Sequence, residues 1–409
     1  MKFGGTSVGS AERIEGVARL VAEHRAQDPL VVVSALGGVT DQLIRGARLA
    51  LKRDPEAAAV VEELHRRHQE AIRGLLPEGP ERERLFRHVQ AVLGELGVLY
   101  QGVHYLEELT PRSLDAISAM GERLSFEIAA AALAARGLHT QAVDARLVLV
   151  TDETFGRAQP RLAETGTRLR ARVLPLIHEG RIPLLPGYIG ATEEGVTTTL
   201  GRGGSDWSAS LFGSLLDARE IQIWTDVDGM LTVDPRAVPG ARPVPEVSFA
   251  EAAELAYFGA KVLHPATIRP AVEKGIPVRV LNTMNPTAPG TRIVAEAGGE
   301  TGAPRALAFK KGLHVVLIRE PRMLGAHGFL ARVFEIFARH RTSVDLISTS
   351  EVSVSLTVDD PSALPGIERD LRELGDVQIL PAMAIVSVVG RGFSRQSGLA
   401  ARVFGALRD

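Results

Sequence analysis

The start of the chain combines a lysine, two glycines and two hydroxyl side chains, since residues 2–7 read Lys-Phe-Gly-Gly-Thr-Ser. Paired glycines let backbone N–H groups approach an anion closely, and a helix that begins after such a loop adds partial positive charge. Lys2 adds a full positive charge. The pattern predicts a phosphate-binding loop, with an ordinary turn and a surface lysine as the alternative. It is not a Walker A loop, because the lysine precedes the glycines.

A second polar loop, residues 197–206, holds three glycines, four hydroxyl side chains, one arginine and one aspartate. Arg202 can hold a carboxylate or a phosphate through two hydrogen bonds, or it forms a surface salt bridge. Ser205 or Asp206 is expected to cap a helix over residues 206–216. The loop therefore predicts either an anion site or a plain helix start.

Acidic side chains follow in two further loops. Residues 224–229 read Trp-Thr-Asp-Val-Asp-Gly and residues 234–236 read Asp-Pro-Arg, groups that suit nucleotide contacts but also favour plain turns. Glu122 stands at a helix start among mainly apolar neighbours, so it either complements the helix dipole or binds an ammonium group. The histidines lack the spacing of a metal site, and no metal ligand is predicted.

These loops lie between elements that alternate along the chain. From residue 112, short β-branched strands alternate with amphipathic helices, which predicts an α/β fold with a mainly parallel sheet flanked by helices. Residues 41–110 are predicted to be helix-rich. The other predicted helices are 11–25, 122–136, 161–179, 206–216, 251–261 and 265–274, and the predicted strands are 29–34, 139–144, 181–188, 220–225 and 277–281.

The turn-rich segment 284–304 predicts a domain boundary near residue 300. The first domain is then 1–300, and 305–383 follows with the β-α-β-β-α-β order of a ferredoxin-like unit. Its predicted strands are 313–319, 344–349, 352–358 and 376–380, and its predicted helices are 328–340 and 363–374. A strand at 384–389 and a helix at 398–407 begin a second unit, 384–409, which a partner completes or which stops short.

Composition excludes several classes of function. With 409 residues and a net charge of −2, the chain lacks the excess positive charge of most nucleic-acid-binding proteins. No apolar run reaches the ~18 residues that span a bilayer. Zero cysteines exclude disulfides and thiolate chemistry. We therefore expect a cytoplasmic protein without nucleic-acid or membrane partners.

Taken together, the loops make the chain similar to the amino-acid kinase family, and within it to the aspartokinases. Unit 305–383 resembles an ACT domain, the amino-acid-binding module that regulates such enzymes, and its sequence is similar to the lysine-sensitive type. The runs that carry the resemblance are 2–7, 198–206, 224–226, 234–236 and 258–265 for the kinase, and 323–330 and 343–352 for the ACT unit.

The resemblance implies transfer of the γ-phosphoryl group of MgATP to the β-carboxylate of L-aspartate, the first step toward lysine, threonine and methionine, with feedback inhibition by lysine. Lys2 and Asp206 would be catalytic, and Mg²⁺ would arrive with the nucleotide. The implied ATP-binding residues are Gly4, Gly5, Thr6, Ser7, Thr225, Asp226, Asp234, Arg236 and Lys261. The implied aspartate-binding residues are Ser34, Thr40, Glu122, Arg202 and Ser205.

For the effector, we expect Asp345 to contact the ammonium group of lysine. Asp345 is an acidic residue at the start of a predicted strand, beside a predicted helix that begins with a glycine. The full expected set is Met323, Gly328, Val344, Asp345, Ser350 and Val352. Paired ACT units would join the chain into a homodimer or a larger homo-oligomer. Three alternatives are a kinase of glutamate or a nucleoside monophosphate, a non-catalytic lysine sensor, and a fragment of a bifunctional aspartokinase.

Overall fold

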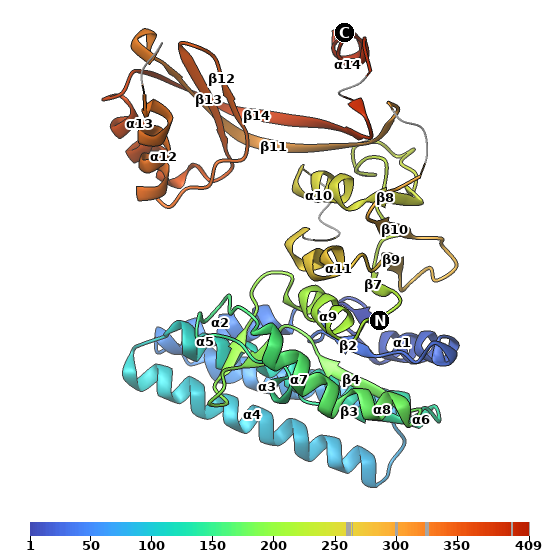
Figure 1. The fold of residues 1–409 in the computed structure, drawn as a ribbon. Helices are drawn as coiled ribbons and strands as arrows, with labels where there is room; N and C mark the ends of the chain where they lie inside the picture. Colours follow the sequence, from blue (N-terminus) through green and yellow to red (C-terminus); the bar gives the residue numbers. More distant parts are fainter. Residues whose placement is uncertain (259–262, 264, 299–301, 324–326, 394–395, 409) are drawn as a thin grey trace. The chain divides into compact units, whose positions relative to one another are not determined.

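The computed structural model describes residues 1–258, 263, 265–298, 302–323, 327–393 and 396–408 (Figure 1). The chain forms two compact units, residues 1–301 and residues 302–409.

An eight-stranded sheet forms the centre of the first unit. Its first six strands are parallel to their neighbours, and only β9 and β10 pair antiparallel. The mainly parallel sheet predicted from the sequence is therefore present. In spatial order the strands are β3 (Thr140–Ala142), β4 (Ile182–Pro186), β2 (Val31–Val33), β1 (Lys2–Phe3), β7 (Ile221–Thr225), β9 (Val278–Asn282), β10 (Thr291–Val294) and β8 (Glu246–Ser248). A separate hairpin pairs β5 (Ile189–Ala191) with β6 (Thr197–Thr199).

Helices cover both faces of this sheet (Figure 1). The helices of the unit are α1 (Ala11–Glu23), α2 (Val39–Leu51), α3 (Glu56–Leu75), α4 (Pro80–Leu106), α5 (Pro111–Ser118), α6 (Met120–Ala135), α7 (Leu162–Arg172), α8 (Leu174–His178), α9 (Gly204–Leu215), α10 (Phe249–Phe258) and α11 (Arg269–Glu273). The single helix predicted over 161–179 is wrong, since α7 and α8 are separate. Pro175 in the first turn of α8 explains the break, because proline cannot continue a helix interior.

The two residues of β1 point to opposite faces of the sheet, as successive strand residues do. Phe3 is fully buried in the core cluster that also holds Ile14 of α1, and its ring stacks on Trp224 with centroids 5.9 Å apart. Lys2 points to the other face, where its ammonium group reaches Asp206 of α9. Strand alternation therefore places the lysine against the start of α9.

The second unit is a four-stranded antiparallel sheet with the order β12-β13-β11-β14. Its elements are β11 (Pro304–Arg319), α12 (Phe329–Arg339), β12 (Ile347–Thr349), β13 (Ser353–Val358), α13 (Leu364–Leu371), β14 (Asp376–Gly390) and α14 (Leu399–Ala406). The sequence predicts separate strands at 376–380 and 384–389, whereas the structure has one strand, β14. Both parts pair with the long strand β11, so no turn is needed between them.

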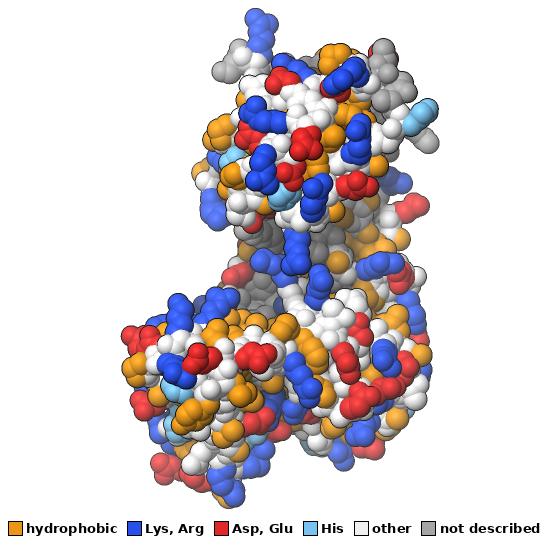
Figure 2. Space-filling model, turned by 90° about the vertical axis from the view of Figure 1, so that its left-hand side faces the viewer, with side chains coloured by type: hydrophobic (Ala, Val, Ile, Leu, Met, Phe, Trp, Pro, Cys, Tyr) orange, Lys and Arg blue, Asp and Glu red, His pale blue; other side chains and the backbone are white. Residues whose placement is uncertain are grey.

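No helix among the described residues is long and apolar enough to cross a membrane. On the face that Figure 2 shows, lysine and arginine side chains are interspersed with aspartate and glutamate side chains. This mixture agrees with the small net charge of the chain.

Candidate active site

The order of the strands places the predicted site loops side by side. The strands β4, β2, β1, β7 and β9 are consecutive and parallel, so the loops after them share one edge of the sheet. The chain leaves β1 between β2 on one side and β7 on the other, a topological switch point where α/β proteins commonly bind ligands. The glycine loop 4–7 therefore lies between loop 34–38 and loop 226–229.

The ammonium group of Lys2 forms an ion pair with Asp206, with 2.6 Å between Nζ and Oδ1. Both side chains are nearly buried. A Cβ added at Gly4 would lie 3.3 Å from this Nζ, so the cation rests against the glycine loop. The predicted cap at Ser205 or Asp206 is wrong, because Gly203 is the N-cap residue of α9, with a φ of +70°. Asp206 thus lies in the first turn, with its carboxylate turned to Lys2.

Gly5 makes the closest contact between the first two loops. A Cβ at this position would lie 3.0 Å from the carbonyl oxygen of Ala35 and 3.3 Å from Cα of Gly37. The N–H of Gly37 donates to the carbonyl of Gly5 at 3.0 Å. Only glycine fits this approach without displacing one loop from the other.

Further contacts fix the same loops from outside. The hydroxyl groups of Ser7 and Thr283 are 2.7 Å apart and buried, so Ser7 ties the glycine loop to the end of β9. The guanidinium of Arg13 donates to the carbonyl of Thr6, and that of Arg67 donates to the carbonyl of Gly37. Sequence reasoning missed Thr283 and both arginines, because nothing in their local sequence marks them.

Glu122 lies in the first turn of α6 and is only 3% exposed. Its Oε1 accepts a hydrogen bond from the N–H of Ala35 at 3.1 Å. Its Oε2 is buried and has no hydrogen-bond partner among the described residues. Burial raises the pKa of Glu122 to about 8. Such a carboxylate is ready to bind a cation that a ligand supplies.

The other residues predicted to bind aspartate surround the same edge. Ser34 follows β2, and its carbonyl accepts a hydrogen bond from the hydroxyl of Ser125 at 2.8 Å. Thr40 lies in the first turn of α2, and Ser205 lies buried in the first turn of α9. Arg202 is exposed in the turn before α9 and has no ion pair within the part of the chain that the structure describes. The arrangement brings one cation and one carboxylate to the β2 side of the glycine loop.

The predicted nucleotide residues fall on the β7 side. Thr225 ends β7, and its hydroxyl donates to the carboxylate of Asp226 at 3.2 Å. Asp234 and Arg236 form an ion pair with each other, with 2.7 Å between Nη2 and Oδ2, and the hydrogen bonds from Arg236 lower the pKa of Asp234. The predicted residue Lys261 lies outside the described residues. Within those residues, no group of three or more histidine and acidic side chains could hold a metal ion.

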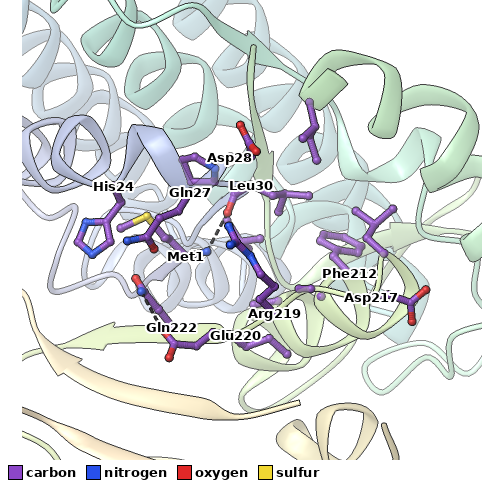
Figure 3. A pocket seen from close by; sticks show the side chains of 18 of the residues that line it. Met1, His24, Gln27, Asp28, Leu30, Phe212, Asp217, Arg219, Glu220 and Gln222 are labelled. Carbon is purple, nitrogen blue, oxygen red and sulfur yellow. Dashed lines mark hydrogen bonds between the residues drawn. The ribbon is translucent and has the colours of Figure 1, made fainter. Parts of the chain in front are cut away.

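A cavity of about 710 Å³ lies at the opposite, amino-terminal ends of β1, β2 and β7 (Figure 3). The buried α-amino group of Met1 donates to the carbonyl of Leu30 at 2.8 Å, and burial lowers its pKa to about 5. None of the predicted site residues lines this cavity.

In the second unit the predicted effector residues form two groups. Glu320 joins two of these residues: its N–H donates to the carbonyl of Val352, and its carbonyl accepts a hydrogen bond from the N–H of Met323. Met323 and Val352 therefore lie near each other, beside the turn that contains Ser350. Asp345 precedes the other end of β12, and its carboxylate is 2.8 Å from Nζ of Lys310. The remaining members are Gly328, which caps the start of α12, and Val344, which packs against the core of the unit.

Comparison with known proteins agrees with this arrangement. The Amino acid kinase family matches residues 1–282, and the ACT domain family matches residues 321–367. The chain belongs to the amino acid kinase family.

Within that family, the chain belongs with the aspartokinases. It is 38% identical to lysine-sensitive aspartokinase 3 of Escherichia coli over 419 residues, which cover 99% of this chain and 90% of the relative. It is 37% identical to the chloroplastic aspartokinase 2 of Arabidopsis thaliana, over all of this chain and 77% of the relative. The E. coli aspartokinase III structure in complex with lysine and aspartate matches with a TM-score of 0.83 at 36% identity, over 99% of this chain and 90% of that one. The predicted family and fold class are thereby confirmed.

Proposed function

We propose that this chain is an aspartate kinase that transfers the γ-phosphoryl group of MgATP to the β-carboxylate of L-aspartate, and that lysine inhibits it. Solved structures of its E. coli relative are described with aspartate and ADP in one state and with lysine and aspartate in another. The observation in this chain that carries the proposal is the Lys2–Asp206 pair against the glycine loop, together with the buried Oε2 of Glu122, which has no hydrogen-bond partner among the described residues.

The substrate ammonium group would bind to Glu122, and Arg202 would hold the α-carboxylate. These two contacts leave the β-carboxylate of aspartate free to face the glycine loop. Ser34, Thr40 and Ser205 would complete this pocket. The arrangement favours an amino acid over a plain dicarboxylate, because the buried carboxylate of Glu122 needs a cation.

The phosphates of ATP would lie on the glycine loop and the start of α9. The N–H groups of Gly5 and Thr6 have no hydrogen-bond acceptor within the described part of the chain, so they can donate to a phosphate. Thr225, Asp226, Asp234 and Arg236 would face the rest of the nucleotide. Lys261 stays a prediction outside the described residues. Mg²⁺ would arrive with the nucleotide.

In the chemical step a β-carboxylate oxygen attacks the γ-phosphorus, and the bond from that phosphorus to the bridging oxygen of ADP breaks. No group of the enzyme bonds covalently to the phosphoryl group. Lys2 stabilises the negative charge on the transferring group, and Asp206 keeps its ammonium group in place. Catalysis then depends on positioning and electrostatics.

We also propose that the effector site joins two copies of the chain. Within one chain, Asp345 is separated from Ser350 by the length of β12, about 15 Å of extended backbone. β12 is an edge strand, and Leu346, Ile347 and Val352 on or beside it are exposed, which favours pairing with a second copy. Light scattering with and without lysine tests this point, and a monomer under both conditions would contradict it. The predicted cytoplasmic location stays a prediction.

The deciding experiment measures ADP release from MgATP with and without L-aspartate and millimolar lysine. We expect turnover that depends on aspartate, is lost in Lys2→Ala, and persists in the control Lys52→Ala, which removes an exposed lysine at the end of α2. Lysine binding without any turnover would instead support a non-catalytic sensor. Turnover with glutamate in place of aspartate would contradict the proposed substrate.

A further inference from the structure

We propose that Asp115 is a positioning residue for the aspartate pocket, because it joins the loop that carries Arg202 to the helix that carries Glu122. This inference rests on the proposed function, since it concerns how the same pocket is assembled.

Asp115 lies in α5 and is 2% exposed. Its carboxylate accepts hydrogen bonds from the N–H of Gly156 at 2.9 Å, from the N–H of Thr199 at 2.9 Å, and from the hydroxyl of Thr199 at 2.7 Å. Among the residues that the structure describes, no lysine or arginine pairs with it. Burial raises the pKa of Asp115, and these hydrogen bonds oppose that rise. This buried carboxylate accepts hydrogen bonds from neutral donors on two segments, so it holds those segments together.

Both segments meet beside Arg202. Thr199 is the last residue of β6, and its carbonyl also accepts a hydrogen bond from the N–H of Ala158 at 2.9 Å. Gly201 has a φ of +78°, and a Cβ there would lie 2.8 Å from the carbonyl oxygen of Gly156. The turn that Asp115 holds through Gly156 thus lies directly against the turn that leads into Arg202.

On its other side, Asp115 is joined to Glu122 through the backbone. The helix α5 ends at Ser118, and α6 begins at Met120 with Glu122 in its first turn. A shift of β6 relative to α5 therefore changes the separation between the guanidinium of Arg202 and the carboxylate of Glu122. An amino acid carries its carboxylate and ammonium groups on one carbon, so the pocket tolerates little change in this separation.

A merely structural role makes a different prediction. If Asp115 only stabilised the fold, its loss would lower the folded fraction and hence the apparent kcat, with the KM for both substrates unchanged. A positioning role raises the KM for aspartate more than the KM for ATP, because most of the proposed nucleotide contacts outside the glycine loop and the start of α9 lie on the β7 side.

The test compares Asp115→Ala with wild type in steady-state kinetics. We expect kcat/KM for aspartate to fall by about 100-fold, the scale of a ~1 Å misplacement of a positioning group, with a much smaller change in kcat/KM for ATP. The control is Asp54→Ala. Asp54 accepts a hydrogen bond from the N–H of Glu56 at the start of α3, and it belongs neither to β6 nor to the turn that contains Gly156. The control should keep the wild-type KM for aspartate.

A double-mutant cycle with Arg202→Ala shows whether Asp115 acts through the arginine. In the Arg202→Ala background, we expect Asp115→Ala to change kcat/KM for aspartate by much less than it does alone, since coupled residues are not additive. Full additivity, or an equal loss of kcat/KM for both substrates, overturns the inference. If Asp115→Ala does not fold, Thr199→Val removes the hydroxyl partner alone, and an unchanged KM for aspartate in that variant overturns the inference equally.

The two proposals fail in different ways. A wild-type chain without aspartate-dependent turnover contradicts the proposed function and removes the basis of this inference. An active wild type with a normal KM for aspartate in Asp115→Ala contradicts the inference alone.

Discussion

The raised pKa of Glu122 predicts that aspartate use depends steeply on pH. In the proposed pocket, Glu122 would bind the substrate ammonium group only when it is ionised, and burial raises its pKa to about 8. Below pH 8 most of the free enzyme therefore holds a proton on the carboxyl group that the substrate needs. The carboxylates of aspartate remain ionised throughout this range.

The size of the effect follows from the ionised fraction. For a pKa of about 8, this fraction is ~1% at pH 6, ~9% at pH 7 and ~50% at pH 8. Because apparent affinity scales with the competent fraction, kcat/KM for aspartate should rise about tenfold from pH 6 to pH 7 and about fivefold more by pH 8. The pH at which kcat/KM reaches half of its plateau reports the pKa of the free enzyme.

The assay is ADP release at saturating MgATP, with aspartate varied at each pH. Glu122→Gln is the control variant, since it keeps the size and shape of the side chain but cannot ionise. We expect its kcat/KM for aspartate to be about 10- to 100-fold lower than wild type at pH 8, the range for a lost hydrogen bond to a charged group, and to lack the steep rise. A wild-type profile that is flat between pH 6 and pH 8 would refute the reasoning.

The same shift has a consequence for stability. A carboxyl group whose folded pKa is raised above its ordinary value of 4.5 favours folding most below pH 4.5, and the fold loses that advantage as pH rises toward 8. For a shift of this size, the free energy of unfolding at pH 8 is lower than that below pH 4.5 by on the order of 4 to 5 kcal/mol. Glu122→Gln should therefore unfold at a higher temperature than wild type at pH 8, with little difference at pH 4.5. Thermal unfolding at both values measures this difference.

Three further perturbations have expected outcomes. Asp206→Asn should lower kcat by about 10- to 100-fold, because the ammonium group of Lys2 loses its charged partner, and a normal kcat would remove Asp206 from the mechanism. Gly5→Ala should lower kcat/KM for ATP by about tenfold or more, because its Cβ meets the backbone of loop 34–38, and unchanged kinetics would refute that contact. Lys310→Met removes a cation that competes with the effector lysine for Asp345, so the lysine concentration for half inhibition should fall by about fivefold. A dose–response curve measures this concentration, and a higher value would contradict the assignment of Asp345.

Much of the fold could be predicted from local patterns. Runs of valine and leucine between turn residues predicted the buried strands, and the alternation of strands with helices predicted the parallel sheet. Apart from the helix break at Pro175 and the cap of α9, which are local, the errors occurred where contacts distant in the sequence decide the outcome. The strand β14 continues through 384 because β11 lies beside it over its full length, and no local pattern shows that pairing.

The site residues were predicted from their motifs, but most of their contacts were not. The sequence indicated that Lys2 and Asp206 belong to polar loops, and the resemblance gave them a joint role. Their meeting depends on the face of β1 to which Lys2 points and on the capping residue of α9. The pairing of Lys310 with Asp345 was missed, since Lys310 lies on β11 and Asp345 precedes β12, 35 residues further along the chain.

Three acidic residues of the first unit show why sequence alone could not assign their roles. Asp206 has a cation, Lys2, as its partner, and Asp115 is satisfied by neutral donors that lie 41 and 84 residues away. Within the described residues, Glu122 receives one hydrogen bond from another residue, 87 positions away, and its second oxygen stays buried without a donor. The first two carboxylates have partners within the described residues, an ion pair for Asp206 and hydrogen bonds for Asp115, so their loss disturbs geometry. Of the three, Glu122 alone has a buried oxygen with neither an ion pair nor a hydrogen bond within the described residues, and this difference supports the proposal that Glu122 selects an amino acid.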